Sequence, residues 1–206
     1  MENILLQEKD YNMLNFEEKE VLEILKKTGA ILKGHFLLTS GTHSDGYIQC
    51  ARILQYPSYA KKVLELIAKK VKHLDMEIVV GPALGGIIVA YELGRQLNKR
   101  AMFAERKDGI MQFRRGFVIK PGEKVLITED VVTAGTSTME VKRLVEERGA
   151  DVIGVACIVD RRSPEYNLLD LPLYSALKMS INTYTPDDCP LCKLGKPLEN
   201  PGSRFI

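Results

Sequence analysis

The sequence predicts an α/β fold in which helices cover both faces of a parallel sheet. Short runs of β-branched and other apolar residues alternate with segments whose apolar residues recur at helical spacing. Glycine or proline follows most of these segments, as expected where strands and helices end. Regular alternation of strand and helix is typical of a parallel sheet. At 206 residues, 45% of them hydrophobic, the chain can bury one core without a disulfide or metal staple.

Each predicted element rests on a local pattern of this kind. Val21, Leu22 and Leu25 form a helical stripe that Gly29 stops, and the Lys-Val-Leu-Ile-Thr run at 124–128 is the strongest strand. The predicted helices cover residues 17–28, 57–73, 86–97 and a segment that begins near Met139 and is closed by Gly149, and the predicted strands cover residues 77–80, 101–104, 124–128 and 152–159.

This order of elements predicts a single domain over residues 1–206. Residues from about 1 to 55 fit the alternation less well, and we expect them to form an N-terminal helix and a hood, or flap. Residues from about 56 to 185 would form the core sheet. Residues from about 186 to 206 would form a C-terminal arm.

Charge and composition exclude several classes of protein. Lys and Arg number 29 and Asp and Glu 27, so the net charge of +2 is too even for a general nucleic-acid or membrane surface. No apolar run approaches the length of a bilayer span, and residues 1–10 lack the pattern of a secretory signal. Four cysteines, two of them isolated, do not make a disulfide framework. We therefore expect a cytoplasmic protein without nucleic-acid or membrane partners.

Four segments follow predicted strands, and we expect the binding and catalytic residues to lie in them. In parallel α/β sheets, ligands bind outside the carboxyl ends of the strands. The segments at this edge are residues 81–86, 105–116, 129–137 and 160–162.

The segment 125–137 is the most informative stretch. Its strand delivers two adjacent carboxylates, Glu129 and Asp130, to the sheet edge, and residues 133–137 (Thr-Ala-Gly-Thr-Ser) then open a helix. Small residues, exposed N–H groups and the helix dipole favour a phosphate there. An ordinary strand-to-helix turn with Ser or Thr caps is the alternative. The acid pair and the hydroxyl-rich loop occur together, which favours a sugar phosphate whose hydroxyls, or a magnesium ion, the acids would bind.

Residues 129–137, with the strand before them, resemble the phosphoribosyl-pyrophosphate (PRPP) fingerprint of the type I phosphoribosyltransferases. Within that family the chain is most similar to the orotate-specific members, from about Thr28 to the C-terminus. The supporting stretches are residues 34–44, 80–86, 103–107 and 159–161. The resemblance implies a Rossmann-like type I phosphoribosyltransferase fold with a small N-terminal hood. It also implies a magnesium-dependent pentosyltransferase that makes orotidine 5′-monophosphate and pyrophosphate from orotate and PRPP, in pyrimidine (UMP) biosynthesis.

The same resemblance implies roles for particular residues. Glu129 and Asp130 would hold the ribose 2′ and 3′ hydroxyls, and Arg106 and Lys107 begin a mobile loop over the pyrophosphate that reaches the neighbouring subunit of a homodimer. Ser40, Gly41 and residues 44–48 would lie in the flap over the base. Thr133 and Arg161 would contact orotate, and Mg²⁺ would be held mainly through PRPP rather than directly by the protein. The expected catalytic residues are Arg106, Lys107 and Asp130, and the expected PRPP-binding residues are Ala83, Leu84, Gly85, Gly86, Glu129, Asp130, Val131, Val132, Thr133, Ala134, Gly135, Thr136 and Ser137.

Three departures from the family pattern concern positive charge. Lysines familiar in the family are absent at Thr39 and Gly85, and the mobile loop after Lys107 is shorter. Arg114 and Arg115 are candidates to replace these cations, because guanidinium groups bind phosphate oxygens bidentately. The alternative, which we favour, is a solvated arginine pair at the end of a hairpin.

Two other functions are compatible with the same motifs. One is the same transfer to a purine base. The other is a PRPP-sensing regulator without catalysis, which the missing lysines would allow. Such regulators usually carry an added nucleic-acid-binding segment, and the sequence has no basic stripe of that kind.

The remaining candidates lie near the two ends of the chain. Cys189 and Cys192 have the spacing of a metal or redox pair, but zinc needs two further ligands, which Cys50, Cys157 or the histidines would have to supply through the fold. We favour a reduced structural pair for these cysteines. For His35 and His43 we favour simple hydrogen bonding, and for residues 197–206 an extended arm, with a subunit contact as an option.

Overall fold

The computed structural model describes residues 8–38, 40–162 and 169–201. The chain divides into two compact units, one formed by residues 1–53 with 179–206 and the other by residues 54–178. The expectation that the whole chain acts as a single domain stays a prediction.

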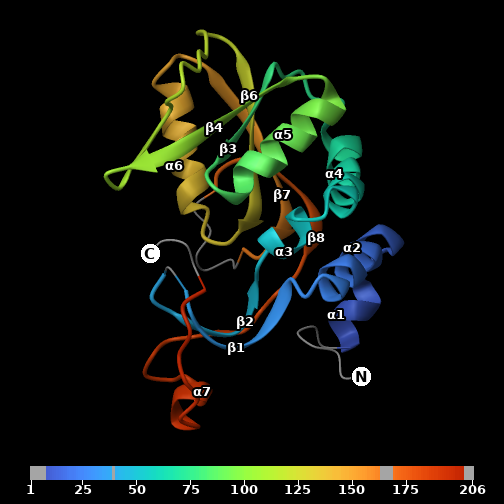
Figure 1. Ribbon diagram of the computed structural model, residues 1–206, viewed down its shortest axis with the longest axis vertical. Coiled ribbons are helices and arrows are strands. Elements are labelled where there is room, and N and C mark those ends of the chain that lie inside the picture. The colour runs from blue at the N-terminus through green and yellow to red at the C-terminus, as the bar shows by residue number, and fades with distance from the viewer. Residues whose placement is uncertain (1–7, 39, 163–168, 202–206) are drawn as a thin grey trace. The chain divides into compact units, whose positions relative to one another are not determined.

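The larger unit contains the α/β core that the sequence predicts (Figure 1). Its six-stranded sheet has the order β5-β4-β3-β6-β7-β8, in which all neighbouring strands are parallel except the pair β4 and β5. The strands are β3 (Ile78–Pro82), β4 (Arg100–Lys107), β5 (Ile110–Gln112), β6 (Lys124–Val132), β7 (Asp151–Asp160) and β8 (Leu173–Lys178), and the helices are α4 (Pro57–Val71), α5 (Gly85–Leu97) and α6 (Thr136–Glu146).

The helices cover both faces of this sheet, as predicted. From β3 the chain crosses through α5 to β4 in one direction, whereas from β6 it crosses through α6 to β7 in the other. Because such crossovers are right-handed, opposite directions place α5 and α6 on opposite faces. Figure 1 shows α4 and α5 together on one side and α6 on the other. Central strand residues such as Val80, Ile127 and Val155 are therefore fully buried.

This topology fixes where a ligand can bind. The strand order reverses between β3 and β6, which are hydrogen-bonded neighbours with Val80 opposite Ile127. The crevice at such a reversal, outside the carboxyl ends of the strands, is the usual ligand site of open α/β sheets. The segments that leave β3 and β6 are residues 83–84 and 133–135, both of which the sequence singled out.

Two of the four segments expected to follow strands, residues 105–116 and 129–137, instead begin within strands. β6 continues to Val132, so Glu129 and Asp130 lie in the strand, where pairing with β7 continues as far as Val132 opposite Asp160. β4 continues to Lys107 and turns back into β5, with Glu105 paired to Gln112 and Lys107 to Ile110. Backbone pairing with a neighbouring strand lengthens both strands, and apolar pattern alone does not reveal such pairing.

The smaller unit contains a three-stranded sheet of order β1-β2-β9. Its helix α2 starts with a capping box: the Asn15 side chain accepts a hydrogen bond from the Glu18 N–H (2.9 Å), and the Glu18 carboxylate accepts one from the Asn15 N–H (3.0 Å). The elements outside the core sheet are α1 (Glu8–Met13), α2 (Phe16–Lys27), β1 (Ile31–Leu37), β2 (His43–Ile48), α3 (Ala51–Leu54) at the boundary of the units, β9 (Thr183–Tyr184) and α7 (Pro190–Lys193).

The helices of the structure bear on the expected absence of a membrane span. No helix in the described ranges is long and apolar enough to span a bilayer.

Candidate active site

The turn from β3 into α5 is built for close approach of backbone. A Cβ on Gly81 would lie 2.0 Å from the Gly86 carbonyl oxygen, so only glycine fits at position 81. The Ala83 N–H donates to the Ala104 carbonyl of β4 (2.7 Å), which holds the turn against the neighbouring strand. Ala83 and Leu84 are joined by a cis peptide bond, and Leu84 is largely exposed. Residues 83–86 therefore present backbone to the crevice at the carboxyl edge of the sheet.

Asp130 of β6 lies directly against this turn. A Cβ on Gly85 would lie 2.4 Å from Asp130 Oδ2 and 2.6 Å from its Cγ. Any side chain at position 85 would require the Asp130 carboxylate to move. This contact gives a physical reason for the absence of the lysine that the family resemblance led us to expect at Gly85.

The two carboxylates of β6 are held by the backbone around them. The Val131 N–H donates to Asp130 Oδ1 (2.8 Å), and the Asp130 N–H donates to Glu129 Oε1 (3.2 Å). Burial raises the pKa of Asp130, and this outweighs the lowering effect of its hydrogen bonds. A carboxylate whose charge is poorly solvated gains from hydroxyl or cationic partners that a ligand supplies.

The turn from β6 into α6 has the geometry of an anion site. Gly135 is the N-cap of α6 with φ of 86°, and a Cβ there would lie 2.8 Å from Leu169 Cγ. Glycine has no side chain to cap the first N–H groups of the helix, so these groups are suited to an anion. Thr133 and Thr136 are exposed beside them, and Ser137 is half-buried.

Arg161 follows the last residue of β7 and lies next to the turn that leads from β6 into α6. Its backbone N–H donates to the Val132 carbonyl (2.8 Å), which places it beside the end of β6. Its neighbour Arg162 donates to both carboxylate oxygens of Asp160 (3.0 and 3.1 Å), and Asp160 is 3% exposed. Asp160 therefore pairs with Arg162.

The two candidate cations of the β4–β5 hairpin, Arg106 and Lys107, differ in their surroundings. Arg106 pairs with Glu140 of α6 and donates to the Gly109 carbonyl (3.0 Å). Lys107 is exposed.

Arg114 and Arg115 are both exposed, which agrees with the favoured interpretation of a solvated pair, and both contact Glu105. Arg115 binds both oxygens of Glu105 (2.8 and 3.1 Å), and Arg114 lies 3.5 Å from the same carboxylate. The Arg115 guanidinium holds the pKa of Glu105 below its usual range. Sequence reasoning missed Glu105 and Glu140 as partners because each pair joins residues nine or more positions apart in the chain.

The remaining predicted residues lie in the smaller unit. Ser40 and Gly41 lie between β1 and β2, and residues 44–48 belong to β2. Ser44 is fully buried and donates to the Asn182 carbonyl (2.8 Å). Thr39 lies outside the described residues.

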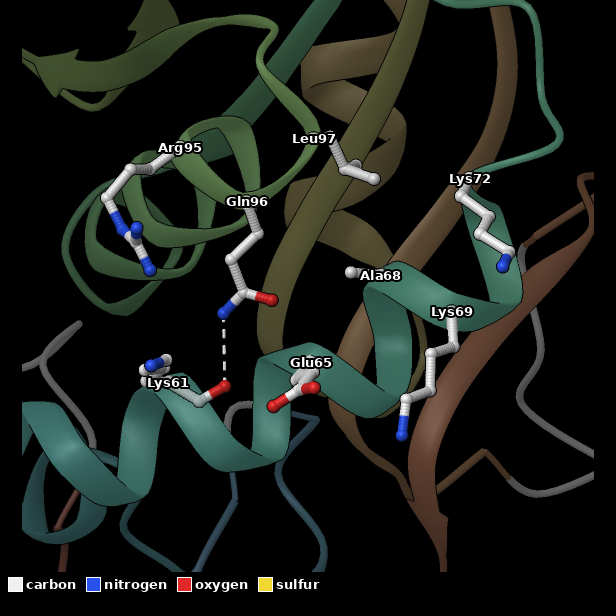
Figure 2. Close-up of a pocket in the computed structure, with 8 residues that line it drawn as sticks. All are labelled: Lys61, Glu65, Ala68, Lys69, Lys72, Arg95, Gln96 and Leu97. Carbon is white, nitrogen blue, oxygen red and sulfur yellow. Dashed lines mark hydrogen bonds between the residues drawn. The ribbon is translucent and has the colours of Figure 1, made fainter.

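A hollow of about 460 Å³ lies away from these side chains, between α4 and α5 (Figure 2). Gln96 bridges the two helices there by donating to the Lys61 carbonyl (3.0 Å). α5 begins at the carboxyl end of β3 and runs back along the sheet, so its last turn lies toward the opposite edge. The hollow is lined by Lys61, Glu65, Ala68, Lys69, Lys72, Arg95, Gln96 and Leu97, and none of these belongs to the candidate site.

Gly85→Ala tests the contact between Gly85 and Asp130 of β6. The added methyl group must displace the Asp130 carboxylate, so we expect kcat/KM for PRPP to fall by about 100-fold, the effect of a misplacement of about 1 Å in a catalytic site. Steady-state kinetics would measure this. Ile88→Ala, at an exposed position in the same helix, is the control and should keep normal kinetics. Normal kinetics for Gly85→Ala would contradict the contact.

The fold, with two glycine-containing turns at the reversal of strand order, defines a class of protein. The chain matches the family of the phosphoribosyl transferase domain over residues 49–174, and it belongs to that family. It is 53% identical over 188 residues to the orotate phosphoribosyltransferase of Thermoanaerobacter sp. (strain X514), an alignment that covers 91% of this chain and 98% of the relative.

Solved structures agree on the fold. The orotate phosphoribosyltransferase of Aeropyrum pernix superposes with a TM-score of 0.65 at 26% identity, covering 85% of this chain and 98% of that one. The UMP synthase of Leishmania donovani superposes with a TM-score of 0.68 at 22% identity, covering 82% of this chain and 38% of that longer chain. The predicted type I phosphoribosyltransferase fold is thereby confirmed.

Proposed function

We propose that this protein is an orotate phosphoribosyltransferase of pyrimidine biosynthesis. It would transfer ribose 5-phosphate from PRPP to orotate, giving orotidine 5′-monophosphate and pyrophosphate. The observation that carries the proposal is the convergence of residues 83–86, the carboxylate of Asp130 and the N-terminus of α6 at one point of the sheet edge. The 53% identical relative with the same activity in its name supports orotate as the acceptor.

PRPP would bind across the two turns. The N–H groups at the start of α6, with the hydroxyls of Thr133, Thr136 and Ser137, suit the 5′-phosphate. Glu129 and Asp130 would accept hydrogen bonds from the ribose 2′ and 3′ hydroxyls. Backbone N–H groups of residues 83–86 would hold the pyrophosphate, since Gly85 and Gly86 carry no side chain that could cover them.

The chain itself needs to supply no nucleophile. When pyrophosphate leaves the anomeric carbon, positive charge develops on the ribose and negative charge on the pyrophosphate. Asp130, close to the ribose, would stabilise the first, and Arg106 and Lys107 the second, by preorganised charge. Arg106 must leave Glu140 to reach the pyrophosphate, so closure of the β4–β5 hairpin would exchange one ion pair for another.

The residues present fit a magnesium ion held mainly through PRPP. Glu129 and Asp130 offer the carboxylate oxygens that Mg²⁺ prefers, and Mg²⁺ commonly combines one or two carboxylates with water and phosphate oxygens. In the described part of the chain, the one group of three or more His, Cys, Asp or Glu side chains that could hold a metal ion lies in the smaller unit. When bound, Mg²⁺ would neutralise charge on the pyrophosphate.

Arg161 and Thr133 would select orotate. Orotate carries a carboxylate, and a guanidinium binds carboxylate oxygens bidentately, which uncharged bases cannot match. Arg161 leaves the sheet beside the turn of residues 133–137, so a base held there would be next to the bound ribose. We further propose that the enzyme works in the cytoplasm as a homodimer, which family resemblance supports.

A transfer assay with different acceptor bases tests the proposed activity. Purified protein with Mg²⁺ and PRPP should consume orotate and release pyrophosphate. The loss of orotate is measured by its ultraviolet absorbance. Adenine and xanthine in place of orotate are the controls and should give no release. Turnover of a purine base without turnover of orotate would replace the proposal by a purine transferase. PRPP binding without turnover of any base would favour a regulator.

A further inference from the structure

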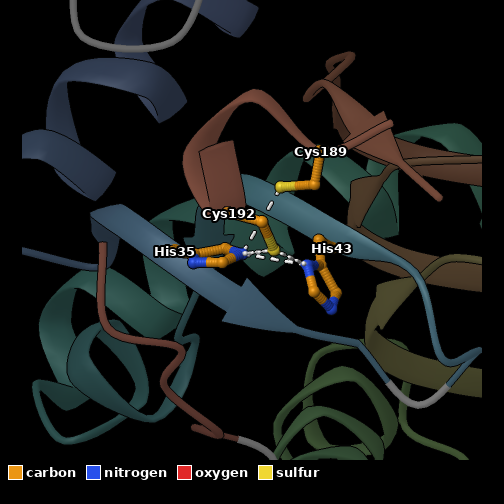
Figure 3. A group of neighbouring side chains, drawn as sticks. All are labelled: His35, His43, Cys189 and Cys192. Atoms are coloured by element: carbon orange, nitrogen blue, oxygen red, sulfur yellow. Dashed lines mark hydrogen bonds between the residues drawn. The ribbon is translucent and has the colours of Figure 1, made fainter. Parts of the chain in front are cut away.

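Four side chains of the smaller unit converge in a cluster that the transferase reaction does not use. His35 lies on β1 and His43 is the first residue of β2. Cys189 is the N-cap of α7, and Cys192 lies within that helix. Figure 3 shows the two imidazoles and the two thiols pointing toward one another. The hairpin and the cysteine pair are about 150 residues apart in sequence, and the fold brings them together.

The distances within the cluster are close to those of a tetrahedral zinc site. With Zn–N of about 2.0–2.1 Å and Zn–S of about 2.3 Å, tetrahedral geometry separates two nitrogens by about 3.3 Å and a nitrogen from a sulfur by about 3.6 Å. His35 Nε2 lies 2.9 Å from His43 Nδ1, 3.4 Å from Cys189 Sγ and 3.6 Å from Cys192 Sγ, and His43 Nδ1 lies 3.3 Å from Cys192 Sγ. All four atoms lie within 4.8 Å of one another. The widest of these separations exceeds the ideal value by about 1 Å, so an ion at their centre requires side-chain shifts of that order.

The orientation of His35 is fixed as a metal ligand requires. Its Nδ1 lies 2.9 Å from the Lys196 carbonyl oxygen, which can only accept, so Nδ1 carries the proton. Nε2 therefore faces the cluster with its lone pair. Donation of the second ring N–H to a backbone carbonyl is the usual arrangement around metal-bound histidines.

Burial and redox state favour a metal over a thiol pair alone. His35, His43 and Cys189 are 2%, 6% and 0% exposed, and both cysteines are free thiols. A redox pair or a reduced structural pair gives no reason for two buried imidazoles to face the same thiols. Two thiolates and two neutral imidazoles around one divalent ion have zero net charge, which makes the group inexpensive to bury.

We propose that His35, His43, Cys189 and Cys192 bind one Zn²⁺ ion in a closed, structural site. A donor set of two sulfurs and two nitrogens in tetrahedral arrangement selects zinc over magnesium or calcium, which take oxygen ligands. On binding, each cysteine thiol gives its proton to solvent, so two protons leave as two Zn–S bonds form. Four protein ligands leave no open position for catalysis at the ion.

The site would fasten the C-terminal segment to the β1–β2 hairpin. α7 has four residues and is too short to be stable alone. After it, the Glu199 N–H donates to the His35 carbonyl (2.7 Å), and the Leu37 N–H donates to the Glu199 carbonyl (2.8 Å). The ion would therefore fix both the helical turn and the short parallel bridge that follows it.

Metal analysis of the untagged full-length protein tests this site. We expect about one zinc per chain after purification without chelators, and substitution by Co²⁺ should give the intense visible bands and the thiolate charge-transfer band of a tetrahedral site. Chelation should lower Tm. Absence of zinc together with failure to take up Zn²⁺ or Co²⁺ in a titration would overturn the proposal. A weak octahedral Co²⁺ spectrum, or a Cys189–Cys192 disulfide in protein purified without oxygen, would do the same.

Matched variants locate the ligands. Cys189→Ser and Cys192→Ser should each reduce bound zinc at least tenfold, whereas His73→Ala, which removes the remaining histidine of the chain at an exposed position, should leave it unchanged. Cys192→His offers zinc another nitrogen and should retain more metal than Cys192→Ser. Full zinc content in both serine variants would contradict the assignment. Because the Co²⁺ spectrum is measured on the unaltered protein, poor folding of a variant leaves the test intact.

Discussion

Asp130→Asn is expected to lower kcat/KM for PRPP by about 10- to 100-fold while leaving the fold intact. A hydrogen bond to a charged group contributes about 1.5–3 kcal/mol, and the change removes the charge from the carboxylate proposed to bind the ribose and to stabilise its developing positive charge. Asparagine is nearly isosteric, and its Oδ1 can still accept from the Val131 N–H. Steady-state kinetics at saturating orotate would measure the loss.

The same variant should be as stable as the parent at neutral pH, or more stable. Because burial raises the pKa of Asp130, the folded state binds this proton more tightly than the unfolded state does. The free energy of unfolding therefore falls as pH rises from the ordinary pKa of 3.8 through the raised value. Asparagine removes this loss of stability. The difference in Tm between the two proteins should close below pH 3.8, where the carboxyl group is neutral in both states.

Asp151→Asn is the control for both measurements. Asp151 is exposed and begins β7, at the opposite edge of the sheet from the candidate site. We expect unchanged kinetics for this variant. Parent-like kinetics for Asp130→Asn would remove Asp130 from the site. A large loss of stability at pH 7 would show that its ionised carboxylate supports the fold.

The core sheet could be predicted because its determinants are local. β3, β6 and β7 are runs of buried apolar residues with turn signals behind them, and α2 follows a helical stripe that ends at Gly29. The carboxyl ends of such strands share one edge, so the edge that carries Glu129, Asp130 and Arg161 follows from order alone.

Contacts between distant residues could not be predicted. The continuation of β4 to Lys107 depends on pairing with β5, and the ion pair of Arg106 depends on Glu140, 34 positions away. Likewise, nothing near Cys189 in the sequence shows that His35 and His43 lie beside it. The spacing of Cys189 and Cys192 gave two ligands, and only the fold supplies the other two.

The steric demand on Gly85 is another case of this kind. In the sequence, the missing lysine reads as the loss of a cation. In the structure, the space that a side chain would fill is taken by Asp130, so the glycine and the acid form one arrangement.

Arg161→Ala is expected to raise KM for orotate by about 10- to 100-fold and to change KM for PRPP little. The range follows from the loss of a charge-assisted hydrogen-bond pair of about 1.5–3 kcal/mol. Arg161→Lys keeps the charge but not the bidentate geometry, so its KM for orotate should lie between those of the parent and the alanine variant. Initial rates with each substrate varied in turn would separate the two constants.

Arg143→Ala is the matched control, since Arg143 is an exposed arginine on α6. Its kinetics should be those of the parent protein. Whether the Arg161→Ala variant raises the KM for orotate alone or both KM values decides the role of Arg161. A change that merely disturbed the end of β7 would also disturb the adjoining turn of residues 133–137. That disturbance would weaken PRPP and orotate together. A rise confined to the KM for orotate therefore assigns Arg161 to the base, and an equal rise in both constants would contradict that role.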